Sequence, residues 1–125
     1  MKAIRLLTAI ALILISIHCH GKSKIVFEYT EYNFGNVKKN SAVTHIFKFY
    51  NKGNSTLTID RVKAGWGCTG SVVSSRSIPA GGSGEIEITL YTDERSGQIH
   101  KTISVYSNDP DRGIVVLTVI ANVPE

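Results

Sequence analysis

The sequence predicts an all-β domain of about seven to eight short antiparallel strands, packed as two sheets and preceded by a signal peptide. Strand-like segments recur about every 10 to 15 residues, with Gly, Asn, Asp and Pro between them. Several segments alternate apolar and polar residues, and no window of about 11 residues shows a helical period. The 125 residues suffice for one ordinary domain, which at about 100 residues needs no disulfide to fold.

The first 21 residues have the features of a signal peptide, which leaves residues 22–125 as the folded domain. Lys2 and Arg5 supply positive charge, and an uncharged apolar run of 12 residues, from Leu6 to Ile17, follows them. A helix that spans a bilayer needs about 20 such residues, so this run is typical of a signal-peptide core. A short membrane anchor or a buried strand is the alternative. We expect an exported protein in the periplasm, on the outer membrane as a lipoprotein, or outside the cell.

Two routes of processing remain open. Cleavage after Gly21 places Cys19 and Gly21 at the third and first positions before the cut, where small residues are favoured. Alternatively, Cys19 becomes a lipidated first residue, although Ser16 and His18 are unusual in the residues before such a cysteine. Cys19 is therefore a candidate lipid-attachment residue, and a lipid there would tether the protein to a membrane.

The charge of the chain excludes nucleic acid as an expected partner. The formal net charge is +4, from 14 basic and 10 acidic residues. Removal of residues 1–21 takes away Lys2 and Arg5, so 12 basic residues remain against 10 acidic ones and the net charge falls to +2. The remaining charges of both signs are interspersed and form no basic run. Contact with a membrane is expected only through the signal peptide or a lipid anchor.

The strands are predicted from apolar runs and from alternation. In chain order, the predicted segments are residues 24–29, 42–51, 56–64, 71–74, 85–92, 98–107 and 114–123. Segment 71–74 is predicted as a short edge strand. Val62 is out of step with Leu57 and Ile59, which predicts a β-bulge. In the stretch from residue 32 to 41, Phe34 and Val37 are predicted to plug one end of the core.

Four segments predict which side chains face the core. In each of them, apolar residues occupy every second position, or nearly so. The predicted inward-facing residues are Val43, His45, Phe47 and Phe49; Ile86, Ile88 and Leu90; Ile99, Ile103 and Val105; and Val115, Leu117, Val119 and Ala121. These faces favour two packed antiparallel sheets that share one core.

Several short motifs, taken in order, resemble a known family. They are FGNV, FKFYNKG, GCT, IPAG, GQIHKTI and SNDP, and they lie between about Tyr32 and Val123. This pattern resembles the bacterial domain-of-unknown-function 1573 family. The resemblance implies an immunoglobulin-like sandwich, related in shape to the major sperm protein and Hydin-like domains. It also implies an exported bacterial protein of a kind common in Bacteroidetes, and it implies no reaction, because the family has no agreed activity.

The family often has Cys-Gly-Cys where this sequence has Trp66-Gly67-Cys68, so a two-thiolate site does not transfer. A redox or metal role for Cys68 needs a second thiolate or a nearby histidine. His45 and His100 are the remaining candidates, and we expect them on different faces. Cys68 is otherwise a half-buried loop residue. Trp66 either packs over the end of the sandwich or anchors a partner.

Two other motifs have structural explanations. Asn108, Asp109 and Asp111 offer oxygen ligands for calcium, but a calcium site gathers about six to eight oxygens, and turn chemistry before Pro110 explains these residues without a metal. Asn54 begins a glycosylation sequon that has little weight in a bacterial protein. The serines of residues 71–77 lack the glycine pattern of a hydrolase nucleophile.

The sequence favours an exported, non-enzymatic immunoglobulin-like module that binds a partner or serves as a scaffold in the bacterial cell envelope. The expected partner is an envelope or secreted protein or a glycan, and no cofactor, metal or catalytic residue is predicted. The loop from Ala64 to Ser77, with Trp66 and Cys68, is the predicted partner-binding loop. The alternative is a periplasmic protein that handles thiols or metals through Cys68. A chaperone-like carrier of subunits is a third hypothesis, based on the fold alone.

Overall fold

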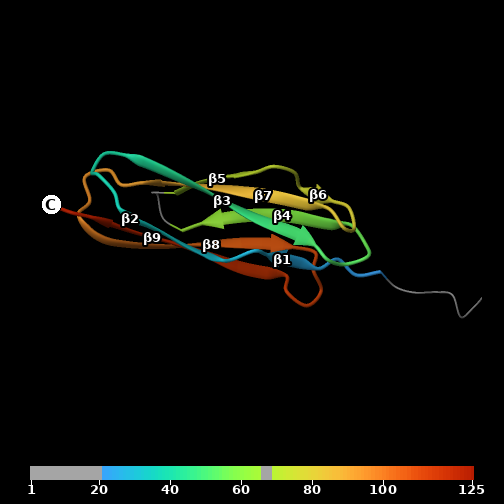
Figure 1. Cartoon of the computed structure of the whole chain (residues 1–125). Coiled ribbons are helices and arrows are strands. Elements are labelled where there is room, and N and C mark those ends of the chain that lie inside the picture. Colours follow the sequence, from blue (N-terminus) through green and yellow to red (C-terminus); the bar gives the residue numbers. More distant parts are fainter. Residues whose placement is uncertain (1–20, 66–68) are drawn as a thin grey trace, which may run out of the picture.

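The computed structural model describes residues 21–65 and 69–125, which form two stacked β-sheets (Figure 1). One sheet has four strands in the order β1-β3-β7-β5, and the other has five in the order β2-β9-β8-β4-β6. The strands of the described ranges are β1 (Ile25–Phe27), β2 (Glu31–Asn36), β3 (Ala42–Asn51), β4 (Leu57–Ala64), β5 (Thr69–Val73), β6 (Ser77–Ile78), β7 (Ser83–Tyr91), β8 (Gly97–Ser107) and β9 (Ile114–Val123).

The predicted all-β sandwich is confirmed, with two differences in detail. The described residues form nine strands because residues 31–36, which lie outside the predicted strand segments, form β2, and because β6 adds a two-residue strand. The pairing is not wholly antiparallel, since β2 runs parallel to β9. The chain leaves β1 in one sheet and continues in the same direction as β2 in the other. No reversing turn separates the two strands, so β2 keeps a direction that matches the last strand.

The core lies between the two sheets, and all four predicted alternating faces point into it. On β3 and β7, Phe47, Phe49, Ile86 and Ile88 have no exposed surface. From the other sheet, β8 and β9 contribute fully or almost fully buried residues, namely Ile103, Val105, Leu117, Val119 and Ala121. Because each buried Val, Leu, Ile or Phe side chain stabilises the fold by about 1.5–3 kcal/mol, alternation along these strands holds the sheets together.

Two local predictions about strands are confirmed. The register of β4 against β8 shifts between Ile59 and Arg61, which is the bulge that the position of Val62 predicts. Residues 71–74 fall in or directly after β5, an edge strand that pairs with β7 from Thr69↔Leu90 to Val73↔Ile86.

The prediction of one long irregular stretch from Ala64 to Ser77 is wrong. Ala64 is the last residue of β4, β5 occupies the middle of the stretch, and Ser77 begins β6. Hydrogen bonding of β5 to β7 takes these residues into the sheet, and the backbone N–H of Ser74 continues the pairing by donating to the Glu85 carbonyl at 2.9 Å. Most of the described residues of this stretch therefore belong to strands.

The two ends of the sandwich differ in what they hold. The chain enters beside β1 at one end, and the C terminus lies at the opposite end (Figure 1). The entry end also carries the β3–β4, β6–β7 and β8–β9 connections, while the β2–β3 and β7–β8 connections lie at the C-terminal end.

Candidate functional site

The residues that the sequence singled out as sites are not among those described. Cys19, Trp66 and Cys68 all lie outside residues 21–65 and 69–125. The two residues next to the second gap, Gly65 and Thr69, follow β4 and begin β5. The predicted roles of Cys19, Trp66 and Cys68 stay predictions.

His45 and His100 do not share a site, as expected. His45 lies on β3 and faces inward, among the rings of Tyr29, Tyr32 and Phe47. His100 is exposed on β8, in the five-stranded sheet, opposite Ile120 of β9. Among the described residues, no group of three or more His, Cys, Asp and Glu side chains is placed to hold a metal ion.

The Asp109 carboxylate serves the backbone of the β8–β9 turn and of β1. Its side chain is 4% exposed, and it accepts hydrogen bonds from the N–H groups of Ile25 (2.8 Å), Asp111 (2.8 Å) and Arg112 (3.0 Å). Burial raises the pKa of Asp109, but these hydrogen bonds and the Arg112 charge outweigh it, so the pKa lies below its ordinary value. The turn-forming interpretation of Asp109 is confirmed.

The Asn108 side chain also joins neighbouring segments through hydrogen bonds. Its side-chain oxygen accepts hydrogen bonds from the Ser23 hydroxyl and the Thr58 N–H, both at 2.9 Å. Its side-chain nitrogen donates to the Thr56 carbonyl at 3.1 Å. The turn therefore joins three segments at the entry end of the sandwich. Asn108 and Asp109, two of the three candidate calcium ligands, have structural roles in these contacts.

Among the described residues, β5 forms a sheet edge with no strand on its outer side. It is the last strand of its sheet, and its residues TGSVV include no charge and no proline. Ser74 forms a backbone hydrogen bond with Glu85 of β7. In an antiparallel pair, every second residue makes such bonds, so Val72 pairs in this way with Glu87. The backbone N–H and C=O groups of Ser71 and Val73 therefore point away from β7. Such an edge is a template for an added strand.

An apolar pair lies on the outer face beside this edge. Val72 is 63% exposed and Ile46, on β3, is 43% exposed. Both are in register with Glu87 of the intervening β7. They line a small hollow of about 120 Å³ with Ser74, Glu85 and Glu87. A strand added at the β5 edge would lie next to Val72 on this face, with Ile46 two strands further in.

A second surface feature is a histidine held by aromatic rings where the chain crosses from β1 to β2. The Tyr32 ring stacks on His45 with centroids 3.6 Å apart and an interplanar angle of 7°. The Tyr29 hydroxyl lies 3.1 Å from His45 Nε2. Burial lowers the pKa of His45 below 6.5, so the imidazole is neutral near pH 7. It serves there as a packing group and a hydrogen-bond partner.

Sequence reasoning placed His45 on an apolar face but missed its tyrosine partners. Tyr29 lies in the crossover between sheets and Tyr32 is the second residue of β2, and neither stretch has a periodic pattern that shows which way a side chain points. The available signal was a histidine at an inward-facing strand position, because such a group needs a nearby hydrogen-bond partner.

No helix in the described part of the chain has the length and apolar character needed to cross a membrane. The described surface carries a sheet edge, an apolar pair and an aromatic cluster.

Solved structures share the sandwich fold. A Porphyromonas gingivalis W83 protein of unknown function is 19% identical, with a TM-score of 0.67 over 82% of this chain and 46% of its own. The human CEP192 PapD-like domain 7 is 9% identical, with a TM-score of 0.66 over 83% of this chain and 87% of its own. The YadV chaperone is 16% identical, with a TM-score of 0.55 over 81% of this chain and 52% of its own.

The chain thus spans about half the length of the Porphyromonas protein and of the chaperone. These likenesses show an immunoglobulin-like, PapD-like fold and nothing about activity. No curated protein matches the chain. A family model described as "Protein of unknown function (DUF1573)" matches residues 25–123, which include all nine described strands. The chain belongs to the DUF1573 family.

Proposed function

We propose that this protein is a non-enzymatic binding module of the bacterial cell envelope, and that it binds an extended segment of a partner protein along β5. The free, uncharged edge of β5 is the observation that carries the proposal. The predicted signal peptide supports an envelope location. The sandwich that the chain shares with the YadV chaperone is compatible with a binding role, although that likeness concerns the fold alone.

The other sheet edges are less suited to accept a strand. β1 has three residues and β6 has two, so neither offers a ladder long enough to hold a peptide. β2 carries the charge of Glu31, and its register shifts between Asn33 and Asn36. Gly35, inside that shift, has a φ of 73°, which bends the strand edge. β5 combines extended geometry with unprotected backbone groups.

Strand addition would supply two kinds of contact. The outward N–H and C=O groups of Ser71 and Val73 would pair with the backbone of the partner and give affinity with little dependence on its sequence. The exposed side chain of Val72 would contact a side chain of the partner on the same face and favour an apolar residue there.

Photo-cross-linking in the native host tests the proposal. A benzophenone amino acid replaces Val72 on β5, and in a matched control it replaces Val116, which is 48% exposed on β9 in the other sheet. We expect a recurrent envelope-protein adduct from position 72 and none from position 116. Mass spectrometry of the adduct should locate the cross-link in an extended apolar segment of the partner.

A second pair of variants separates backbone pairing from side-chain contact. Ser71→Pro removes an outward N–H while leaving the bonds of β5 to β7, whereas Ser71→Ala keeps that N–H. Adduct yield should fall at least about threefold in the proline variant, because a net backbone hydrogen bond contributes about 0.5–1.5 kcal/mol. Equal yields from the two variants, or equal labelling from positions 72 and 116, would contradict strand addition at β5.

A further inference from the structure

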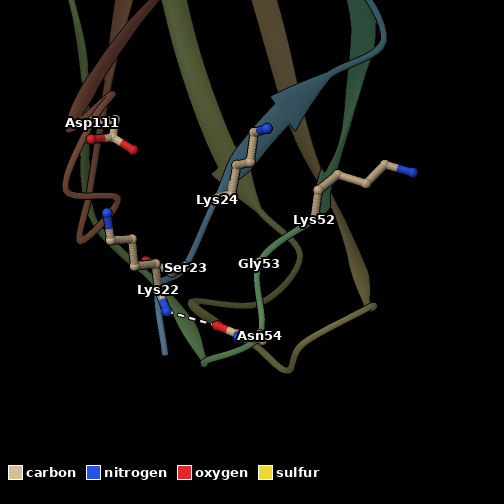
Figure 2. A pocket seen from close by; sticks show the side chains of 7 residues that line it. All are labelled: Lys22, Ser23, Lys24, Lys52, Gly53, Asn54 and Asp111. Atoms are coloured by element: carbon tan, nitrogen blue, oxygen red, sulfur yellow. Dashed lines mark hydrogen bonds between the residues drawn. The ribbon is translucent and has the colours of Figure 1, made fainter. Parts of the chain in front are cut away.

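The entry end of the sandwich concentrates positive charge. Lys22 and Lys24 lie on the first described segment, and Lys52 lies on the β3–β4 turn. All three are exposed. They line a shallow hollow of about 380 Å³, and Asp111 is the only acidic residue that lines it (Figure 2).

Backbone hydrogen bonds fix the lysines in this arrangement. The Lys52 N–H donates to the Lys24 carbonyl at 2.8 Å, and the Asn54 N–H donates to the Lys22 carbonyl at 2.9 Å. The Lys22 N–H in turn donates to the side-chain oxygen of Asn54 at 2.8 Å (Figure 2). The first segment and the turn are therefore held side by side, and the Lys52 ammonium lies 5.0 Å from the centroid of the Tyr50 ring.

The opposite end of the sandwich carries no such excess. Its turns hold three cationic and three anionic side chains, namely Lys38, Lys39, Arg95, Asp93, Glu94 and Glu125. The two ends differ in charge because of where the charged residues lie, since the whole chain after residue 21 has a net charge of only +2. A flat anionic surface would therefore attract the entry end more strongly than the other end.

The chain outside the described residues leads from the same end. The apolar run ends at Ile17, and the candidate lipid-attachment residue Cys19 stands three residues before Lys22. Three extended residues reach at most about 11 Å. A lipid anchor on Cys19 would therefore hold Lys22 within about 11 Å of the lipid surface, a distance of the same order as the Debye length of about 8 Å, so charges still attract there.

We propose that the entry end, through Lys22, Lys24 and Lys52, docks onto the phosphate groups of anionic lipid headgroups. A basic patch beside a lipid anchor adds an electrostatic attraction to anionic lipids, which orients the domain on the membrane. Docked in this way, the sandwich stands with its C-terminal end directed away from the membrane. The proposal is independent of strand addition at β5.

Vesicle binding by the full mature chain, as its host processes it, tests the proposal. The vesicles are phosphatidylcholine alone or with about 30% phosphatidylglycerol, and binding is measured by co-sedimentation. We expect the protein to prefer the phosphatidylglycerol vesicles, and we expect this preference to disappear at about 0.5 M NaCl, because salt screens exposed charges.

Equal binding to both vesicles at low salt, together with unchanged amide exchange at residues 22–24 and 52–56, would overturn the proposal. Should a lipid anchor hold the chain on both vesicles, slower exchange of those amides on the anionic vesicles is the supporting result.

Matched variants separate the patch from overall charge. A triple variant with Lys22→Gln, Lys24→Gln and Lys52→Gln should bind anionic vesicles about 100-fold more weakly. Each lysine near an anionic surface contributes about fivefold to the binding constant. Lys38→Gln, Lys39→Gln and Arg95→Gln remove the same charge from the other end and should leave binding nearly unchanged. Similar losses from both triple variants would contradict a specific docking end.

A variant that is expected to bind more strongly is a useful control, because misfolding would only weaken binding. Asp111→Asn removes the one carboxylate that lines the hollow, so it should strengthen binding to anionic vesicles about fivefold. Unchanged or weaker binding would count against the proposal. Release of the protein from vesicles by about 10 mM inorganic phosphate, at constant ionic strength, would identify a small-anion site instead and would also overturn it.

Discussion

Single polar residues set much of the geometry at the entry end. The Asn51 side chain is fully buried and makes four hydrogen bonds. Its oxygen accepts from the N–H groups of Lys24 (3.1 Å) and Gly53 (3.0 Å), and its nitrogen donates to the carbonyls of Ser55 (2.8 Å) and Ile78 (3.0 Å). One amide therefore satisfies the backbone of three segments, and the position of the lysine patch depends on it.

Gly84 is a residue where a single methyl group should be costly. It is buried on β7 opposite Phe49, and an added Cβ would lie 2.5 Å from Phe49 Cζ and 3.0 Å from Ile78 Cδ1. Gly84→Ala should therefore lower the free energy of unfolding by about 1–3 kcal/mol through overpacking. Urea denaturation measures this change.

Gly113→Ala is the matched control for Gly84→Ala. A Cβ at Gly113 would meet its nearest atom, the Asp109 carbonyl oxygen, at 3.5 Å, which is ordinary contact. Alanine also restricts the unfolded chain, so stability should stay unchanged or rise by about 0.4–1 kcal/mol. A tolerated Gly84→Ala would show that β7 and β3 can separate locally, and the close approach would then be unimportant.

At the scale of elements, Asp109 connects β1 to the β8–β9 turn. Asp109→Asn replaces an accepting oxygen with a donating nitrogen and should cost about 1–3 kcal/mol near pH 7. Because the folded-state pKa lies below the ordinary value of 3.8, the carboxylate contributes its stability above that pH. The contribution is lost as the pH falls below 3.8 through the folded-state pKa.

Urea midpoints measured across acidic pH should show this loss. The stability difference between wild type and Asp109→Asn should be full near neutral pH and should shrink as the solution becomes more acidic. A difference that stays constant with pH would mean that the charge of Asp109 contributes nothing and that only its shape matters.

For the whole molecule, stability is expected to decrease from the middle strands of each sheet to its edges. β3 and β7 pair over nine positions, and β8 and β9 pair over ten. Their central amides should exchange with solvent at a rate set by global unfolding. The outward N–H groups of Ser71 and Val73 should exchange at least about tenfold faster than the Val72 N–H, which faces β7.

Amide exchange followed by NMR checks this ranking. Protection of Ser71 as strong as that of Val72 would show that the edge of β5 is covered in the free protein. The template for strand addition would then be absent.

The sequence alone determined the class of the fold and the faces of its main strands. Alternation fixed which side chains of β3, β7, β8 and β9 are buried, because the side-chain period of a strand is two whatever its neighbours are. The bulge in β4 and the edge strand β5 were also predictable, since each leaves a local mark in the order of apolar residues. Asp109 was predictable as a turn former because an aspartate directly before Pro110 is typical of a turn.

Only the tertiary structure decided which strands lie side by side. The parallel pairing of β2 with β9, the stacking of Tyr32 on His45 and the hollow shared by Lys22 and Lys52 join residues far apart in the chain. Local patterns contain no information about such pairs, because the contacts depend on where the chain changes sheets. Of the candidate sites, the sequence predicted part of the β5 edge strand. The cluster of Lys22, Lys24 and Lys52 at the entry end was not predictable, because the fold brings two separate segments together there.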